Sequence, residues 1–173
     1  GGVTTAVGAQ TASPEPSNTT LARTGGGRLR LTAWTTIPGA SAQAVERIEV
    51  LGDSGPRTLS FWHGNQFQFT PLLGAGQLQV LVDSQVVWSQ DLTVDGAKLT
   101  WSQSTGDLTT ELAGKKNAEL TIRVFGQTAT NQVTATTIDG VDASGFRVFD
   151  GDFEGSHTWA LSRTSPNSIP DIV

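Results

Sequence analysis

The side chains that could carry out acid–base or nucleophilic chemistry are few and far apart in the sequence. The carboxylates considered as catalytic groups are Asp83, Asp91, Asp95, Asp107 and Glu111. A glycosidase needs two carboxylates that face each other across the scissile bond, whereas these residues lie mostly beside Gly, Ser or Lys in expected turns, where Asp is commonly structural. The histidines, His63 and His157, are not accompanied by a G-x-S-x-G motif. We therefore expect no enzymatic activity and no catalytic residue.

The tryptophans are the strongest candidates for ligand contacts, because aromatic rings stack on the apolar faces of sugars. Trp62 follows Phe61, so period-two alternation places it opposite the apolar side chains of its strand. Trp88 follows Val87 in the same way. The expected ligand residues of a carbohydrate site are Trp62, Trp88, Asn65, Gln77 and Gln85. The alternative is that these tryptophans cover a second layer or an interface.

The composition excludes several other classes of site. The 173 residues include no Cys, which rules out disulfides, thiolate zinc sites, iron–sulfur centres and a cysteine nucleophile. The net charge of −5 argues against nucleic-acid binding, because few cations remain to neutralise phosphates. No apolar run reaches the roughly 18 residues of a membrane span. Because the sequence lacks Met and starts with Gly, we expect a processed chain.

Short segments of alternating apolar and polar residues predict an all-β protein with little or no helix. The alternating pairs and triplets are Leu29/Leu31/Ala33, Leu59/Phe61, Phe67/Phe69, Leu78/Val80/Val82, Leu120/Ile122/Val124 and Phe146/Val148. Turn residues rich in Gly, Asp and Asn separate them. Residues 40–51 fit a strand better than a helix, although Val45, Ile48 and Leu51 also have helical spacing. We expect an antiparallel β-sandwich or jelly roll.

Three regions follow from this pattern. Residues 1–28 are rich in Gly, Thr, Ser and Pro and predict an extended N-terminal segment. Residues 29–148 hold the expected strands of the β-sandwich. Residues 149–173 form a C-terminal strand segment, which pairs either with its own sheet or with a neighbouring subunit.

Residues 25–148 resemble the greater part of a galactose-binding-like jelly roll, found in non-catalytic carbohydrate-binding modules and extracellular appendage proteins. The segments that carry the resemblance are Gly25–Leu31, Arg57–Trp62, Gln79–Trp88, Ala118–Val124 and Ile138–Val141. In that family, an N-G-D-F-E motif followed by a Trp comes before these segments. The matching residues here, Asp150 to Glu154 and Trp159, follow them instead.

Three explanations fit this displaced motif. The domain is permuted and the C-terminal strand returns to its own sheet, or the motif opens a following module, or the strand completes the sheet of the next subunit. Donation to the next subunit would pair the open edge of its sheet and fill its core. In that case the assembly residues are Phe153, Trp159 and Leu161.

The resemblance also implies a structural calcium ion near the first and final strands of the sandwich. The matching ligand positions are Glu154 and Asp139, with Asp152 as a further candidate. Such hard oxygen ligands suit calcium. Gly140 stands where the family has a second Asp, which departs from the pattern. The alternative is that these carboxylates only stabilise turns.

These observations lead to two functional hypotheses. The first is a secreted, non-catalytic structural subunit of an extracellular filament or surface appendage, which assembles with identical subunits head to tail through terminal β-strands. The alternative is a carbohydrate-binding module of a secreted glycan-active protein. Neither hypothesis requires a cofactor, and both place the protein outside the cell or on its surface.

Overall fold

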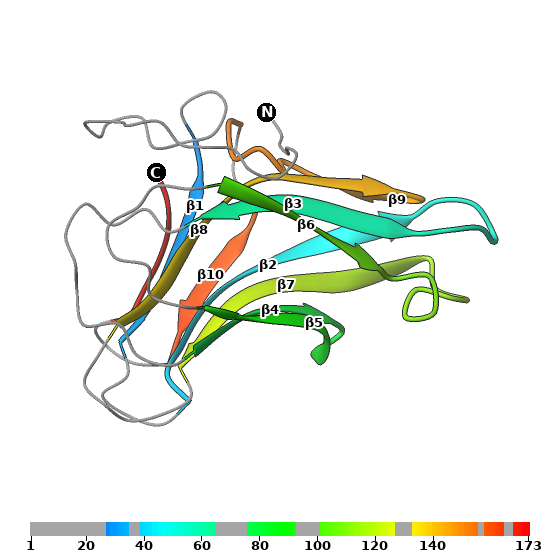
Figure 1. Ribbon diagram of the computed structural model, residues 1–173. Coiled ribbons are helices and arrows are strands. Elements are labelled where there is room, and N and C mark those ends of the chain that lie inside the picture. The colour runs from blue at the N-terminus through cyan, green and yellow to red at the C-terminus, as the bar shows by residue number, and fades with distance from the viewer. Residues whose placement is uncertain are drawn as a thin grey trace.

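The protein is an all-β structure of two antiparallel sheets, as the sequence predicts (Figure 1). The computed structural model describes residues 27–34, 39–64, 76–92, 101–126, 133–155, 158–164 and 168–173. Eleven strands and no helix occur in these ranges. The expected strand at Phe67/Phe69, most of the N-terminal segment, Asn65, Asp95 and His157 lie outside the described residues.

The strands divide into a five-stranded sheet, here called sheet A, and a six-stranded sheet, called sheet B. Sheet A has the order β11 (Ile169–Ile172), β1 (Leu29–Trp34), β8 (Val133–Ser144), β3 (Thr58–Gly64) and β6 (Trp101–Asp107). Sheet B has the order β10 (Ala160–Arg163), β2 (Ser41–Val50), β7 (Asn117–Gly126), β4 (Gly76–Val82) and β5 (Gln85–Leu92). The short strand β9 (Phe146–Val148) also pairs with β2.

The segment that fitted both a strand and a helix is a strand. Ala42, Ala44, Ile48 and Val50 are buried, while most of the residues between them are half-buried or exposed. β2 pairs with β7 along almost its whole length, from Ser41 to Glu49. The strand interpretation of residues 40–51 is therefore confirmed.

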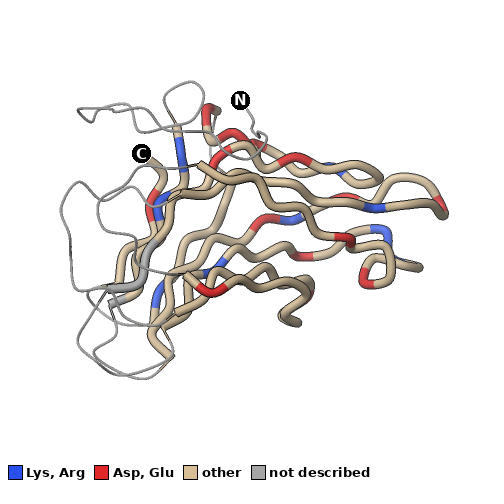
Figure 2. Tube along the Cα trace, in the orientation of Figure 1, with Lys and Arg blue, Asp and Glu red and all other residues tan. Residues whose placement is uncertain are grey.

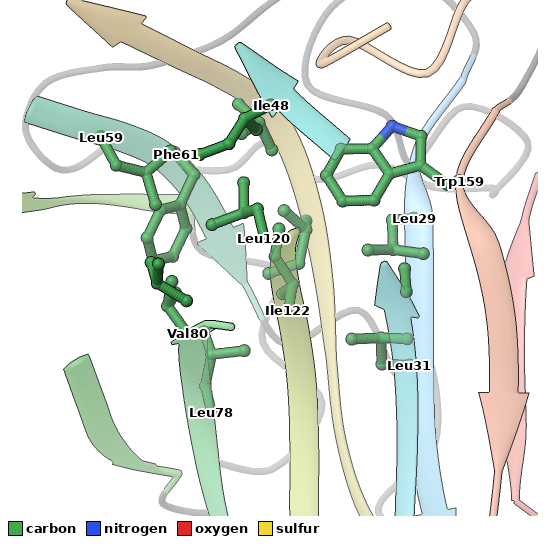
Figure 3. Packing of buried hydrophobic residues seen from close by; sticks show 14 of the residues in the cluster. Leu29, Leu31, Ile48, Leu59, Phe61, Leu78, Val80, Leu120, Ile122 and Trp159 are labelled. Carbon is green, nitrogen blue, oxygen red and sulfur yellow. The ribbon is translucent and has the colours of Figure 1, made fainter. Parts of the chain in front are cut away.

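The core lies between the two sheets, and both contribute apolar side chains to it. Figure 3 shows these side chains pointing toward one another, with the Trp159 ring beside Leu29. Sheet A contributes Leu29, Leu31, Leu59 and Phe61, and sheet B contributes Ile48, Leu78, Val80, Leu120 and Ile122. Each fully buried side chain of this kind stabilises the fold by about 1.5–3 kcal/mol.

A β-bulge interrupts the pairing of β8 with β3. Ser60 lies opposite Asp142, but Trp62 lies opposite Asp139, so β8 holds one extra residue between these two pairs. Gly140 lies in this interval with φ 64°, in the left-handed region that glycine adopts without steric cost. Glycine at position 140 therefore suits the bulge.

The C-terminal segment supplies an edge strand to each sheet of its own chain. β10 pairs with β2 through residues 160–163, and β11 pairs with β1 through residues 169–172. Arg30 strengthens the second pairing, because its Nε and Nη2 donate to the Asp171 carboxylate at 3.1 and 2.7 Å. The backbones of Arg28 and Val173 also exchange two hydrogen bonds. Within this structure, the segment completes the sandwich of its own chain.

Two aromatic residues, Phe153 and Trp159, anchor this segment in the core. Phe153 and Trp159 are buried, and their ring centroids lie 5.4 Å apart. Trp159 Nε1 donates to the Asp150 carbonyl at 3.1 Å, which closes the loop between β9 and β10. Phe153 has φ 58°, which is rare for an aromatic residue. The D-G-D-F-E motif is therefore a turn with a buried Phe153 in this chain, rather than a strand.

Replacement of either anchor should destabilise the whole domain. We expect Phe153→Ala and Trp159→Ala each to lower the free energy of unfolding by about 3–5 kcal/mol, since each leaves a cavity in the core. Phe149→Ala is the matched control, because Phe149 lies in the same segment but is 46% exposed. Urea denaturation measures the free energy of unfolding of the three variants and of the wild type. Equal losses for Phe149 and the two anchors would contradict the anchoring role.

Candidate functional site

The best-defined aromatic cluster closes the side of the sandwich formed by β5 and β6. Trp88 of β5 reaches across the core toward sheet A, with its ring centroid 5.2 Å from that of Phe61 and 6.3 Å from that of His63. His63 Nε2 lies 2.8 Å from Ser104 Oγ on β6. The Trp88 ring packs beside β6, where a Cβ added at Gly106 would lie 3.8 Å from it, an ordinary van der Waals distance. The half-buried Trp88 thus packs mainly against protein.

Burial changes the charge properties of His63 in this cluster. Only 5% of the residue is exposed. Removal from water disfavours the charged imidazolium and lowers the pKa of His63 from its usual 6.5 to about 4. The side chain is therefore neutral at physiological pH, and its hydrogen bond with Ser104 fixes a structural contact.

Trp62 does not lie on a surface that a ligand could reach. It is fully buried and forms a small cluster with Trp101, separate from the main core. Alternation along β3 places Trp62 on the face of sheet A opposite Phe61, whereas Trp88 contacts Phe61 from the core side. The two tryptophans expected to form one stacking surface are thus on opposite faces of β3. The interpretation of Trp62 as cover over a second layer agrees better with its burial.

The polar partners expected beside these tryptophans are also not gathered around Trp62. Gln85 is exposed at the start of β5, directly after the β4–β5 turn. Gln77 lies at the other end of the hairpin, opposite Asp91. The structure therefore does not assemble the predicted carbohydrate site as one surface.

A different polar cluster, which the sequence interpretation missed, crosses sheet B on the face away from the core. Arg123 Nε donates to Gln79 Oε1 at 2.8 Å, Gln79 Nε2 donates to Gln77 Oε1 at 3.0 Å, and Gln77 Nε2 donates to Asp91 Oδ1 at 3.2 Å. We call these four residues the polar row. Gln77, Gln79 and Arg123 alternate with buried residues on their strands. Asp91 instead lies on the edge strand β5, which has no fully buried residue. That alternation marks the outward face but cannot show which residues become neighbours.

Two of the carboxylates considered as catalytic groups, Asp83 and Asp107, stabilise turns, whereas Asp91 lies in β5 and accepts a hydrogen bond from Gln77. Asp83 follows β4 in a two-residue turn with Ser84, and both residues have positive φ. A hydrogen bond from Lys115, followed by one from the Glu119 backbone, lowers the pKa of Asp83. Asp107 accepts hydrogen bonds from the side chain and backbone of Thr109, which lower its pKa. Figure 2 shows acidic and basic residues interspersed over both sheets.

The carboxylates implied as calcium ligands do not gather into a group of three or more in the described part of the chain. Asp139 is buried beside the bulge and accepts the Gly140 N–H at 2.7 Å. Glu154 accepts the Gly27 N–H at 2.5 Å, and Asp152 accepts the Glu154 N–H at 3.3 Å. Among the described residues, no group of three or more His, Asp or Glu side chains could hold a metal ion. We derive no function from a bound calcium ion.

Exposed apolar side chains gather on the C-terminal segment. The exposed large hydrophobic residues of the described ranges are Phe149, Leu161, Ile169, Val173, Leu51 and Val86. The first four of these six belong to residues 149–173. Leu161, expected to take part in assembly, is 39% exposed, whereas Phe153 and Trp159 are buried within the chain.

Comparisons with known proteins do not identify a family. A scan against protein-family models finds no match, and a search of curated proteins finds no relative. In the residues that the structure describes, no helix could cross a membrane. The two antiparallel sheets are compatible with a β-sandwich.

The buried histidine should make stability depend on pH. Because the pKa of His63 is lower in the folded state, the unfolded chain binds an extra proton between about pH 6.5 and 4. The free energy of unfolding contributed by His63 should therefore fall by roughly 3 kcal/mol as the pH drops across this range. Urea denaturation of the wild type and of His63→Gln at pH 7 and pH 4 measures this difference. Ser104→Ala is the control and should keep the pH dependence of the wild type. If the free energy of unfolding changed with pH equally in the wild type and in His63→Gln, His63 would not be its cause.

Proposed function

We propose that this protein is a non-catalytic structural subunit of an extracellular filament or surface appendage, which associates with identical subunits through its C-terminal segment. The observation that carries the proposal is the concentration of exposed apolar side chains on residues 149–173. Exposed apolar residues that gather in one region favour a protein–protein contact over a free surface.

The backbone of β10 offers the more accessible edge for such a contact. Thr164 N donates to Ser41 O, so by antiparallel alternation Ser162 and Ala160 also face their partners on β2. The N–H and C=O groups of Leu161 and Arg163 therefore point away from β2. A strand from another subunit could hydrogen-bond to them and extend sheet B.

The edge of β11 is less suited to strand addition. The backbones of Arg28 and Val173 exchange hydrogen bonds, so by alternation the backbone N–H and C=O groups of Asp171 and Ile169 also point toward β1. The backbone of Pro170, between them, points away from β1. Proline has no N–H, and it commonly protects the edge strands of sheets. We therefore propose that head-to-tail contacts form at β10, where Leu161 contributes its backbone and its exposed side chain.

We also propose that the domain is related to galactose-binding-like modules with a displaced first-strand motif. In support, the C-terminal segment lies beside the start of β1, where Gly27 N donates to Glu154 and Arg28 pairs with Val173. A circular permutation requires this kind of proximity between the two segments. Secretion or display at the cell surface is part of the same proposal.

Changes at Leu161 should weaken self-association without unfolding the domain. Leu161→Pro removes an outward N–H but no hydrogen bond to β2, and Leu161→Lys adds a charge to the contact. We expect both variants to need at least tenfold higher concentration to form large species than the wild type does. Size-exclusion chromatography with light scattering over a concentration series measures this.

Val86→Lys is the matched control for the charge change, because Val86 is 48% exposed on β5, at the opposite edge of sheet B. It should assemble like the wild type. A wild-type protein that remains monomeric at every concentration, or Leu161 variants that assemble normally, would disprove assembly through β10.

A further inference from the structure

Sheet B has a second open edge, on the side opposite β10 (Figure 1). This edge is β5, whose residues are exposed or half-buried and which pairs only with β4 among the described strands. Each strand in the row β10-β2-β7-β4-β5 is antiparallel to its neighbours. The first and fifth strands of such a row run in the same direction. A second copy that is shifted along the row, without being turned over, would therefore bring its β10 alongside β5 in parallel.

The backbone of β5 has hydrogen-bonding groups that point away from sheet B. Asp83 N donates to a carbonyl of β7, so by alternation the backbone of Leu78 faces β5 rather than β7. Leu78 lies opposite Gln90, whose N–H and C=O therefore face β4. The backbone groups of the residues on either side, Ser89 and Asp91, point outward. Neither Pro nor Lys, which commonly protect a sheet edge, occurs in β5.

The side chains of β5 offer an apolar position for Leu161. Leu161 lies opposite the buried Ala44 of β2, so its exposed side chain is on the core-facing side of sheet B. On β5 this side carries Trp88, Gln90 and Leu92. Trp88 and Leu92 are half-buried and pack against the core. In a parallel pair with Leu161 beside Gln90, the Leu161 side chain would lie between these two apolar residues.

The other open edge on that side of the sandwich, β6, does not offer such a position. The core-facing residues of β6 are Ser102, Ser104 and Gly106, which lie opposite core-facing residues of β3. They are small and mostly polar, so they provide no apolar contact for Leu161. The side chains therefore favour β5 over β6 as the partner of β10.

A β-bulge determines which part of β5 is available. The register of β4 against β5 shifts between Val80 and Leu81, where Val87 is the extra residue of β5. After the bulge, Ser89–Leu92 is regular and has the same length as β10. Val86 lies before the bulge and therefore outside this stretch.

We propose that β10 pairs with β5 of a second copy of this chain, in a parallel register that aligns Ala160–Arg163 with Ser89–Leu92. This inference rests on the proposed function and identifies the surface that receives β10. In this register Leu161 N–H donates to the Ser89 carbonyl, and the Leu161 carbonyl accepts the Asp91 N–H. Because each subunit carries the two strands on opposite edges, the contact is heterologous and can repeat from subunit to subunit. With strands about 4.8 Å apart, five strands advance the assembly by roughly 24 Å per subunit.

Disulfide trapping in this Cys-free chain tests the pairing. Ala160→Cys and Ser89→Cys replace two small exposed residues that are register partners in the proposed pair. Their Cα atoms would lie about 4.8 Å apart between subunits, within disulfide range, but roughly 19 Å apart within one chain. We expect the double variant, oxidised where the wild type assembles, to form a ladder of disulfide-linked multimers on non-reducing gels. Each single variant should form nothing larger than a dimer.

The matched control combines Ala160→Cys with Thr105→Cys, because Thr105 is exposed on β6, the other edge on the same side of the sandwich. This variant should form no ladder.

Proline substitution gives an independent test of the outward N–H on β5. Asp91→Pro removes the donor to Leu161 but no hydrogen bond to β4. It should raise the concentration needed for assembly about fivefold to tenfold, as expected for the loss of one hydrogen bond. Asp91→Ala keeps the N–H and should assemble like the wild type. Light scattering over a concentration series measures both variants, and equal behaviour of the two would contradict the pairing.

The trapping outcomes separate this inference from the proposed function. If the wild type assembles but Ala160→Cys/Ser89→Cys forms no ladder, the pairing with β5 is wrong and assembly through β10 remains. A ladder of equal or greater strength from the Thr105 control would also overturn the pairing with β5. A wild type that stays monomeric at every concentration would disprove the proposed function, and the pairing with it.

Discussion

The pairing of the C-terminal strands with β1 and β2 is the constraint on which the rest of the structure depends. Without β10 and β11, β1 would be the unpaired edge of sheet A, and β2 would keep only the short strand β9 on the edge that β10 now covers. Phe153 and Trp159 would also leave the core. Since the chain has no Cys, strand pairing and apolar burial must hold this side closed without a disulfide.

Local patterns in the sequence were sufficient to predict the fold class and several of the strands, although not β6, β10 or β11. Leu29 and Leu31, or Leu120 and Ile122, alternate with polar residues at a period that only strands have, and their burial follows directly. The sequence also singled out the D-G-D-F-E motif and Trp159, but whether the C-terminal segment pairs within one chain depends on contacts between distant segments. Those contacts are not encoded in a local period.

The candidate sites were harder to predict because they depend on register and on which face is covered. Trp62 has the alternation of an outward residue, yet it is buried with Trp101. Gln79 and Arg123 are 44 positions apart, and only the register of β4 against β7 makes them neighbours. Likewise, the single extra residue at Gly140 shifts the pairing of β8 and decides which side chains lie opposite Trp62. A one-residue change in register would reverse every such assignment.

The position of the closing strands late in the chain has a consequence for how the domain folds. Every other described strand precedes β10 and β11, yet β11 must find β1, more than 130 residues earlier. Contacts of such long sequence separation carry a large loop-closure entropy and are associated with slow folding. The nine earlier strands can therefore form partial sheets, but cooperative closure waits for the final segment. During this delay the edges of β1 and β2 that the final segment covers would remain open to other strands.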